Sequence, residues 1–397
     1  MTKMTPSRRT IAIAALVVAH LSGHVGLAGT YYVNDLSFSE LGSVCTAGGN
    51  DANDGLSTST PMRHIQALLD KYPNIGTGDT LWADPGTYVE NITIGSSHSG
   101  LALQGAGADV TVINGNASGS CICLDGFAGG VVTGFTIQNG SAMGGAGIAC
   151  RNGSSPVIAD NYITSNSNQW EWGGGIYAEE GSSPTILDNT ITANFAPEGG
   201  GVYCASSTVV DNNTISGNSA GRGAGIFCAW GQPVVTGNIV SGNEASVYGG
   251  GVYCATGSDA SIVNNAIRGN ASVGNDGGGV YCFESGASLI NNTIVGNSAS
   301  THYGGGICCW SHGENALVAN CIFWGNTAAS GPQVALKVFQ EMTVEYCDVE
   351  GGQAGVYRDP DCVLTCGTGN LDTDPLFSDP GYWDGDTWVE GDHHLKS

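Results

Sequence analysis

The feature that most constrains this chain is a six-residue string that recurs seven times. Its clearest copy is Gly-Gly-Gly-Val-Tyr-Cys at residues 249–254, and successive copies begin 24 to 28 residues apart. The other copies begin at Gly145, Gly173, Gly199, Gly223, Gly277 and Gly304. A repeat of this length is typical of a solenoid, in which each coil buries a face that it could not bury alone. One repeat array, rather than several separate cores, therefore accounts for most of the chain.

Aliphatic columns and two Asn columns accompany the repeated string. In each repeat an aliphatic residue follows the third Gly, another lies three positions before an Asn, and a third lies two positions after that Asn. In the last repeat the final two aliphatic residues are Leu317 and Ile322. The first Asn column is Asn161, Asn189, Asn213, Asn238, Asn265, Asn292 and Asn320, and the second is Asn166, Asn194, Asn218, Asn243, Asn270, Asn297 and Asn326.

These columns predict an all-β solenoid with three short strands in each coil of about 26 residues. Stacking the coils turns each aliphatic column into a buried row with a spacing of about 4.8 Å. We expect the Asn columns to shape turns, because Asn adopts bent backbone conformations and its amide can hydrogen-bond from coil to coil.

The repeats resemble the parallel β-helix coils of the pectin-lyase-like superfamily. The segment 31–88 also resembles the opening of bacterial β-helix proteins, and Asp374-Pro375-Leu376-Phe377 and His394-Leu395 resemble their closing coil. The resemblance implies one right-handed parallel β-helix of ten to twelve coils, capped by a short N-terminal helix near 62–72. It leaves the activity open, because this fold hosts lyases, hydrolases, epimerases, adhesins and scaffolds.

The N-terminus has the features of a secretory signal. Lys3, Arg8 and Arg9 precede the apolar run 11–19, which is too short to span a bilayer, and small residues predict cleavage after Ala28. We predict a signal peptide at 1–28, an N-terminal cap with the first coils at 29–100, regular coils at 101–330, and the last coils with a C-terminal cap at 331–397. The protein is then secreted or held at the cell surface, and no later segment is apolar enough to cross a membrane.

Charge limits the partners. The chain has 11 Lys and Arg against 35 Asp and Glu, so it should repel nucleic acid and anionic lipid. Neutral polysaccharides and cell-surface glycans stay open, whereas acidic polysaccharides would need calcium as a bridge. Asp51, Asn53 and Asp54 form an oxygen-rich loop that could hold calcium, although such residues also form ordinary turns. No other cofactor is indicated.

Six of the 14 Cys residues form a column two positions after the inward aliphatic residue. They are Cys150, Cys204, Cys228, Cys254, Cys282 and Cys309, with Ala178 in the missing place. We expect buried thiols here rather than disulfides, because the coil spacing exceeds the usual Cβ separation of about 3.5–4.5 Å. A local disulfide is expected between Cys362 and Cys366, which lie in a loop of an exported protein.

The residue before each Gly triplet varies from coil to coil, and we call this set the triplet-edge column. It comprises Trp172, Glu198, Arg222, Tyr248, Asp276 and Tyr303, with Trp170 and His302 nearby. Aromatic, acidic and guanidinium groups in one line suit sugar binding; the alternative is a solvated turn. A neighbouring outward column, Tyr177, Tyr203, Phe227, Tyr253 and Tyr281, is expected either to stack for structural reasons or to form a glycan platform.

Catalytic candidates are few. Asp160 and Asp188 occupy adjacent coils about 5 Å apart, the separation of a retaining glycosidase. Arg222 is the best-placed base for a lyase, but Glu198 on the next coil favours a surface ion pair. The sequence therefore predicts an exported β-helix that binds extracellular polysaccharide or cell-surface partners without a recognisable catalytic set. A polysaccharide lyase or glycoside hydrolase, and a structural or adhesion module, are the alternatives.

Overall fold

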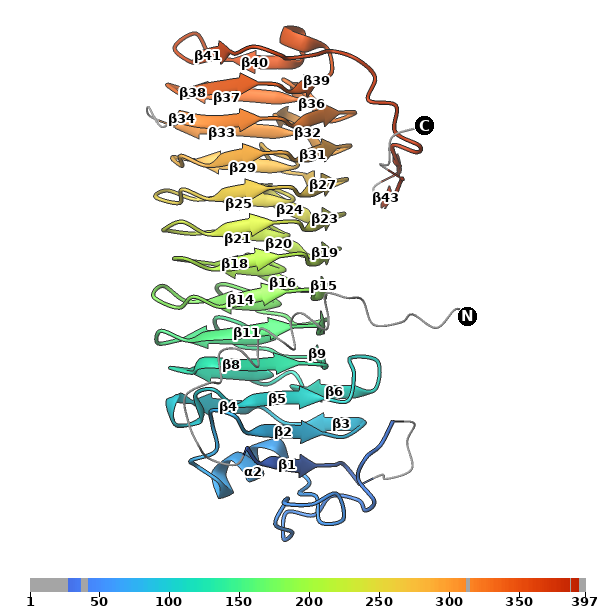
Figure 1. The fold of residues 1–397 in the computed structure, drawn as a ribbon. Helices are drawn as coiled ribbons and strands as arrows, with labels where there is room; N and C mark the ends of the chain where they lie inside the picture. Colours follow the sequence, from blue (N-terminus) through green and yellow to red (C-terminus); the bar gives the residue numbers. More distant parts are fainter. Residues whose placement is uncertain (1–27, 37–41, 312–314, 386, 393–397) are drawn as a thin grey trace.

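The computed structural model describes residues 28–36, 42–311, 315–385 and 387–392, which form one parallel β-helix (Figure 1). Two of its three long sheets contain 11 strands each, so the solenoid has about 11 coils, within the predicted range. We call the three long sheets A, B and C. Along the chain, each coil contributes a strand to sheet C, then to sheet A, then to sheet B, and the next coil begins again in sheet C. The predicted all-β solenoid with three main strands per coil is therefore confirmed.

The three long sheets take one strand from each coil. Sheet A contains β1 (Thr30–Val33), β2 (Thr80–Ala83), β5 (Ala102–Gly105), β8 (Ala128–Thr133), β11 (Ser155–Ala159), β14 (Thr185–Leu187), β18 (Val209–Asp211), β22 (Val234–Thr236), β26 (Ser261–Val263), β30 (Ser288–Ile290), β34 (Asn315–Ala319), β38 (Glu341–Glu345) and β41 (Val363–Cys366). Sheet B contains β3 (Gly86–Val89), β6 (Thr111–Asn114), β9 (Thr136–Gln138), β12 (Tyr162–Thr164), β15 (Thr190–Thr192), β19 (Thr214–Ser216), β23 (Ile239–Ser241), β27 (Ala266–Arg268), β31 (Thr293–Val295), β35 (Ile322–Trp324) and β39 (Asp348–Val349). Sheet C contains β4 (Ile92–Gly95), β7 (Ile122–Asp125), β10 (Ile148–Arg151), β13 (Ile176–Ala178), β17 (Val202–Cys204), β21 (Ile226–Cys228), β25 (Val252–Cys254), β29 (Val280–Phe283), β33 (Ile307–Ser311), β37 (Val334–Val338) and β40 (Val356–Arg358).

A fourth, shorter sheet lies between sheets B and C, where the sequence predicted only a variable loop. Residues just before the Gly triplets pair with their counterparts in the next coil, as Glu198 does with Arg222. We call this sheet D. It contains β16 (Phe195–Glu198), β20 (Ser219–Arg222), β24 (Glu244–Tyr248), β28 (Ala271–Ser272), β32 (Ser298–Tyr303) and β36 (Thr327–Ser330).

The core is the apolar interior that the repeats predict. In six repeats the predicted inward residues are fully buried, for example Ile186, Ile191 and Ile176. The seventh repeat differs by one residue: Val318 and Phe323 are buried, whereas Leu317 is exposed and Ile322 is half-buried. The prediction that Leu317 and Ile322 point inward is therefore wrong. The inward residues Leu289 and Ile294 of the previous coil pair with Val318 and Phe323, one position later than predicted.

The Asn columns hydrogen-bond from coil to coil, as predicted. From Asn161 to Asn292 in the first column, and from Asn166 to Asn326 in the second, each side-chain Nδ2 donates to the Oδ1 of the next Asn at 2.9–3.1 Å. The bent backbone that was predicted at the Asn residues lies one position earlier. The residue before each of these hydrogen-bonded Asn residues has the left-handed conformation, for example Asp188 with a φ of 55°. In the last repeat, Cys321 takes the place predicted for Asn320, and Asn292 N donates to its Sγ.

The prediction of buried thiols in the cysteine column is confirmed, whereas the prediction of a disulfide between Cys362 and Cys366 is wrong. The six column thiols are buried and free, and burial raises the pKa of Cys150. Cys362 and Cys366 are also free; one is buried and the other exposed. Cys366 ends β41 and lies four positions after Cys362, which in an extended chain places the two residues about 13 Å apart. The disulfide expected there is therefore wrong, because a disulfide needs Cα atoms within about 7 Å.

The two ends of the solenoid are covered differently. The helix α2 (Ile65–Lys71) packs against β1 and β4 and confirms the predicted cap. Two short 3-10 helices are η1 (Ser96–His98) and η2 (Gly352–Gly355). The chain then folds back outside the solenoid and forms the hairpin β42 (Tyr382–Asp384) and β43 (Thr387–Val389) (Figure 1).

The leader predicted at 1–28 and the closing residues His394-Leu395 fall outside the described residues, apart from Ala28. Within the described ranges, none of the helices has the length and apolar character needed to cross a bilayer.

Candidate functional site

The triplet-edge column lies along one edge of sheet C. Trp172 bridges to Glu198, Glu198 pairs with Arg222, and Arg222 pairs with Tyr248, so these residues stack coil on coil. Asp276 and Tyr303 continue the same line, because the N–H groups of Gly249 and Gly277 donate to their carbonyl oxygens. The structure thus brings the six predicted residues together in one row along the solenoid axis.

Glycine allows this row to turn back over sheet C. The first Gly of each triplet has a φ between 59° and 80°, a backbone that residues with a Cβ rarely adopt. A Cβ added at Gly173 would lie 2.7 Å from the Cβ of Tyr177. The Gly triplet therefore lets each triplet-edge side chain approach the outward rings of sheet C.

Beneath the row, the outward aromatic residues of sheet C form a continuous stack. Tyr203, Phe227 and Tyr253 have ring centroids 5.1 and 4.8 Å apart and are nearly parallel. Tyr177 and Tyr281 extend the stack at either end, at 5.4 Å from the next ring. These five rings are only 3–7% exposed. The structural role expected for this column is therefore favoured over a glycan platform.

The half-buried triplet-edge rings cover this stack and meet solvent. Trp172 stacks on Tyr177 at 6.0 Å, and Tyr248 stacks on Tyr281 at 4.7 Å. Tyr303 meets the ring of Tyr357 at 4.7 Å. We call the half-buried rings of this surface the aromatic face; they are Trp172, Tyr248, Phe283, Tyr303, Trp310 and Tyr357.

Several residues of this surface were not predicted from the sequence. Phe283 and Trp310 stack at 4.7 Å with an angle of 7°, and Lys337 follows Trp310 in register on the next coil. The signal was a degenerate eighth copy of the repeat, Gly-Pro-Gln-Val-Ala-Leu at 331–336, which places Lys337 in the same outward column.

The charged members of the row are paired. Arg222 Nη1 lies 2.9 Å from Glu198 Oε1, which confirms the expected surface ion pair. Asp276 is 4% exposed; its Oδ1 accepts the backbone N–H of Tyr303, and its Oδ2 lies 3.2 Å from Lys337 Nζ. Burial disfavours the ammonium charge, but the Asp276 carboxylate outweighs it and raises the pKa of Lys337. The ammonium also lies 4.2 Å from the ring centre of Tyr303.

The two flanking candidates lie beside the row, Trp170 in a loop and His302 within β32. Trp170 is 64% exposed, and its backbone N–H donates to Asn168 Oδ1. His302 is half-buried, with Nδ1 2.7 Å from Thr301 Oγ1. Both side chains are accessible from solvent at the margin of the aromatic face.

The catalytic candidates Asp160 and Asp188 lie away from this face, in the turn between sheets A and B. Burial, and then the neighbouring charge of Asp188, raise the pKa of Asp160. Asp188 Oδ1 accepts a hydrogen bond from Asn212 Nδ2 on the next coil. Asp160 and Asp188 follow Ala159 and Leu187, which pair in register, so the two residues lie on adjacent coils, and the backbone of both is left-handed, as expected of turn formers.

The calcium candidates already have protein partners. Asp51 Oδ1 accepts the backbone N–H groups of Arg63 and His64, and Asp51 Oδ2 lies 2.6 Å from His64 Nδ1. Asp54 Oδ1 accepts hydrogen bonds from Leu56 and Thr60, and Asn53 Nδ2 donates to Pro61 O. Throughout the described residues, no group of three or more His, Cys, Asp or Glu side chains is arranged to hold a metal.

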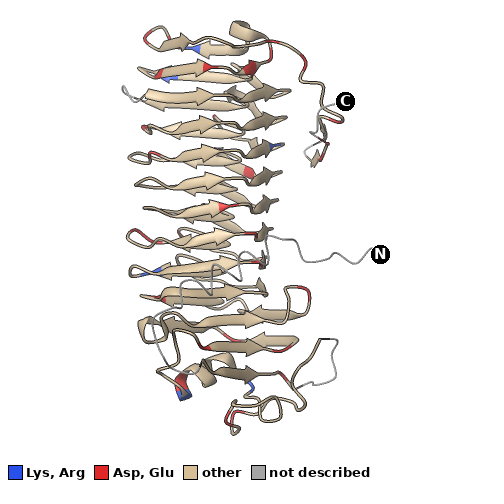
Figure 2. Ribbon diagram, in the orientation of Figure 1, with Lys and Arg blue, Asp and Glu red and all other residues tan. Residues whose placement is uncertain are grey.

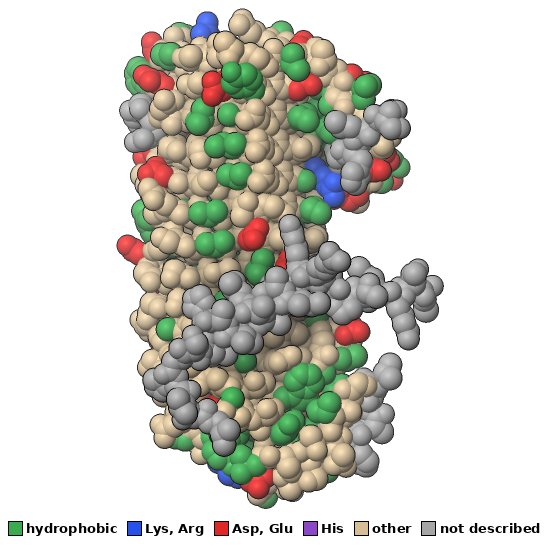
Figure 3. Space-filling view, viewed as in Figure 1, with side chains coloured by type: hydrophobic (Ala, Val, Ile, Leu, Met, Phe, Trp, Pro, Cys, Tyr) green, Lys and Arg blue, Asp and Glu red, His purple; other side chains and the backbone are tan. Residues whose placement is uncertain are grey.

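The surface as a whole is acidic and mostly polar. The formal net charge is −24, and acidic side chains are spread along the solenoid (Figure 2). On the face seen in Figure 3, apolar side chains lie in narrow rows rather than in one broad patch. Such a field disfavours polyanionic ligands and leaves neutral ones unaffected.

A family model described as "Right handed beta helix region" matches residues 99–267 and 248–366, and its description agrees with the predicted handedness. A solved structure, the catalytic unit of a thermostable GH87 alpha-1,3-glucanase from Streptomyces thermodiastaticus, matches 78% of this chain with 16% identity and a TM-score of 0.52. This chain spans 66% of that catalytic unit, just under two thirds. Pectate lyase Pel9A matches 89% of this chain and 84% of its own length with 13% identity, at a TM-score of 0.39. These likenesses concern the fold alone, and no curated protein matches the sequence.

Proposed function

This chain belongs to the right-handed β-helix family, and on that premise we propose that it binds an extracellular polysaccharide along its aromatic face. The observation that carries the proposal is the row of half-buried rings over the ring stack of sheet C. Trp172 and Tyr248 are three coils apart and Tyr248 and Tyr303 two, which corresponds to about 14 Å and about 10 Å along the axis. An extended chain lying parallel to the axis can meet all three rings.

The chemistry of the face suits a neutral sugar chain. Aromatic rings offer large, rigid contact area for the apolar faces of sugar rings, and side chains such as His302 and Arg222 offer hydrogen bonds to hydroxyl groups. The protein carries a net charge of −24, so a polyanionic chain would bind against electrostatic repulsion. The glucanase noted above is named for an α-1,3-glucan, which makes neutral glucans the first ligands to test.

Binding without cleavage fits the carboxylates of this face better than hydrolysis. A glycosidase needs one carboxyl as acid and a second as base or nucleophile. Glu198 is held by Arg222 at 2.9 Å, and Asp276 by Lys337 at 3.2 Å. Each carboxylate therefore already has a cation of the protein as its partner, so neither is placed to reach a glycosidic oxygen without breaking that ion pair.

The test is the affinity of two variants for a panel of α-1,3-glucan, β-1,4-glucan, galacturonan and alginate, measured by affinity electrophoresis. Combining Trp172→Ala with Tyr248→Ala should weaken binding to the best ligand at least tenfold, equivalent to about 1.4 kcal/mol. Tyr162→Ala removes a 39% exposed ring on sheet B and should leave binding unchanged. Equal affinity of the double variant and the wild type would reject the aromatic face as the site.

A second candidate function, glycoside hydrolysis at Asp160 and Asp188, is favoured by one observation, the raised pKa of Asp160 beside a second carboxylate. Such a pair can supply a protonated acid and a charged partner. Incubation of the same panel, with and without calcium, should release reducing ends if this candidate holds. In that case Asp160→Asn and Asp188→Asn should each abolish the release; product formation that survives both changes would reject the pair.

Export and calcium binding belong to the same proposal. The leader predicted at 1–28 supports secretion or display at the cell surface, and cleavage after Ala28 can be read from the N-terminus of the exported protein.

Calcium at Asp51, Asn53 and Asp54 would compete with the hydrogen bonds that these side chains make. Calorimetric titration with calcium tests it, and Asp51→Asn should remove any heat from that loop.

A further inference from the structure

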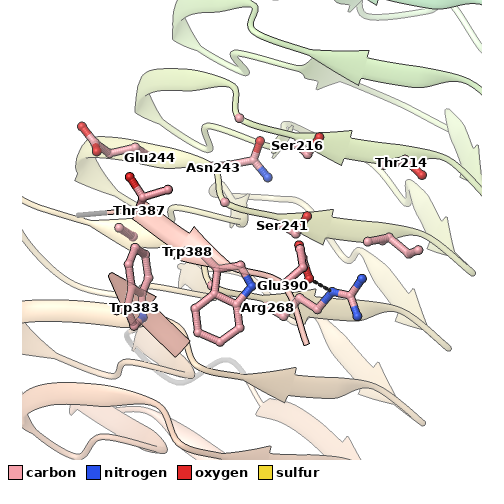
Figure 4. A pocket seen from close by; sticks show the side chains of 15 residues that line it. Thr214, Ser216, Ser241, Asn243, Glu244, Arg268, Trp383, Thr387, Trp388 and Glu390 are labelled. Carbon is pink, nitrogen blue, oxygen red and sulfur yellow. Dashed lines mark ion pairs between the residues drawn. The ribbon is translucent and has the colours of Figure 1, made fainter. Parts of the chain in front are cut away.

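A cleft lies on another side of the solenoid from the aromatic face, between sheet B and the C-terminal hairpin (Figure 4). Its volume is about 570 Å³, within the range of about 300–1,000 Å³ that small-ligand pockets occupy. Strands β19, β23 and β27 provide one side, and the hairpin β42–β43 provides the other.

The hairpin is held on sheet B by specific contacts. Trp383 Nε1 donates to the carbonyl oxygen of Gly296 at 2.7 Å. Arg268 Nε lies 2.8 Å from Glu390 Oε2, as the dashed line in Figure 4 marks. The Trp388 ring packs on the solenoid so closely that a Cβ added at Gly269 or Gly296 would lie 2.0 or 2.2 Å from it. Trp388 is thus a fixed aromatic wall at one end of the cleft.

The floor of the cleft continues the surface on which Trp388 packs. One residue per coil precedes the second Asn column, and all have a φ between 54° and 64°. Ser165 and Ala193 adopt this backbone with a Cβ, whereas the next coils carry Gly217, Gly242, Gly269, Gly296 and Gly325. Trp388 covers Gly269 and Gly296, the third and fourth of these glycines, and leaves Gly217 and Gly242 exposed in the cleft. The same flat surface that accepts an indole ring is therefore open for two further coils.

Polar groups line both margins of this floor. Ser216 and Ser241 lie on successive strands along one margin, and Glu244 lies across from them (Figure 4). The Glu244 carboxylate has no ion pair or side-chain hydrogen bond with the described residues. An apolar floor between hydroxyl and carboxylate groups, closed at one end by a tryptophan, offers what a sugar ring needs: a flat contact and hydrogen bonds at its edge.

We propose that this cleft is a second saccharide site, which holds one or two residues of a neutral glycan on Gly217 and Gly242 against the ring of Trp388. The formal charges at the cleft are those of Glu244, Arg268 and Glu390, a net charge of −1, which favours a neutral ligand over a uronate. The site lies on sheet B and uses none of the rings of the aromatic face. It goes beyond the proposed function, because a chain bound here contacts a different side of the solenoid.

The test uses the full chain with Trp172→Ala and Tyr248→Ala, so that binding at the aromatic face does not contribute. In this background, Gly242→Asn places a side chain on the cleft floor; Asn tolerates the left-handed backbone, and an added Cβ meets nothing within 4 Å. Gly129→Asn is the matched control, since Gly129 has a φ of 66° and equally open space, but lies on sheet A. The probes are α-1,3-, β-1,3- and β-1,4-glucan hexasaccharides, titrated by calorimetry.

We expect at least one hexasaccharide to bind the background protein, with a Kd at least tenfold higher in Gly242→Asn and unchanged in Gly129→Asn. The ring of Trp388 lines the cleft, so its indole N–H resonance in an NMR spectrum should shift on binding. Equal affinities of the two glycine variants would overturn the proposal. Failure of all three probes to bind the background protein would also overturn it, while binding by the wild type would still support the aromatic face.

Discussion

Asp160 occupies a turn position at which most other coils carry Asn or Gly, and the charge of Asp188 on the next coil contributes to its raised pKa. Because its pKa is raised in the folded protein, Asp160 favours folding below its ordinary pKa, and this contribution is lost as pH rises through the raised value. Asp160→Asn should therefore raise Tm by a few degrees at pH 7 and by less at pH 3. Thermal denaturation at both pH values measures the difference.

The control for that prediction is Asn264→Asp, which makes the reverse change at a φ of 58° in a coil whose neighbours in the column are Gly237 and Asn291. It should show little pH-dependent effect. An equal gain for Asp160→Asn at both pH values would mean that backbone preference, and not charge repulsion, is responsible.

The ion pair between the buried Asp276 and the half-buried Lys337 leads to a second prediction at the same scale. Lys337→Met leaves the Asp276 carboxylate, 4% exposed, without its cation, which typically costs about 3–5 kcal/mol. The loss should appear as a lower Tm at pH 7. Adding Asp276→Asn removes the unpaired charge and should recover most of the stability; a double variant as unstable as the single one would show that the ion pair is not the cause.

Residues inside the repeats were predictable because each position is repeated seven times, as the thiol column and the Asn columns illustrate. The role of Asp276 was not predictable in this way. Its partner Lys337 lies 61 residues later in a coil whose repeat is degenerate. The sequence therefore suggested that the Asp276 carboxylate binds a ligand, whereas in the structure it forms an ion pair with Lys337.

At the scale of the element, the first Asn column should depend on each amide as donor and acceptor. Asn213 Nδ2 donates to Ile186 O, Asp211 O and Asn238 Oδ1, and its Oδ1 accepts the backbone and side-chain N–H groups of Asn189. Asn213→Ala leaves several of these groups buried and unpaired, at about 1–3 kcal/mol each. We expect a clearly lower Tm and faster amide exchange in the neighbouring coils.

Asn213→Cys is the informative comparison, because the protein itself uses Cys in this ladder. Asn292 N donates to Cys321 Sγ at 3.4 Å, and Cys321 N donates to Cys347 Sγ at 3.3 Å. The Cys variant should lie between the wild type and Asn213→Ala in stability. A Cys variant no better than Ala would show that the thiols of the last coils do not replace the amide.

An element could be predicted when its signal lay within one repeat of the sequence, and not when it formed only through contacts with distant residues. The shift in the last repeat had a signal, since the two Asn columns are five residues apart in six repeats but Asn320 and Asn326 are six apart. Sheet D had none, because its strands lack apolar alternation and form by pairing with the next coil. The docking of Trp388 on Gly269 and Gly296 also had none, since these residues lie about a hundred positions apart.

At the scale of the whole molecule, the net charge of −24 should govern which polysaccharides bind. Repulsion between an acidic protein and a uronate chain is screened by salt, with a Debye length of about 10 Å at 0.1 M and about 3 Å at 1 M. Affinity for galacturonan should therefore rise with salt, whereas affinity for a neutral glucan should stay nearly constant. Affinity electrophoresis at both salt concentrations measures this, and galacturonan binding that weakens with salt would contradict it.

The long solenoid also places the aromatic face and the sheet B cleft on different sides of one β-helix. Both run along the axis, so a glycan chain parallel to the axis can use several coils in succession. Because the triplet-edge residues also stack coil on coil along the axis, the proposed site is a row of side chains and not a single pocket.

The most direct test of glycan binding at the aromatic face is a crystal structure of the full chain with the glucan hexasaccharide that binds best. We predict sugar rings along the outer edge of sheet C, one of them in contact with Trp172 or Tyr248, with the chain parallel to the solenoid axis. An ordered hexasaccharide elsewhere on the protein, with the aromatic face empty, would show that this face is not the glycan site.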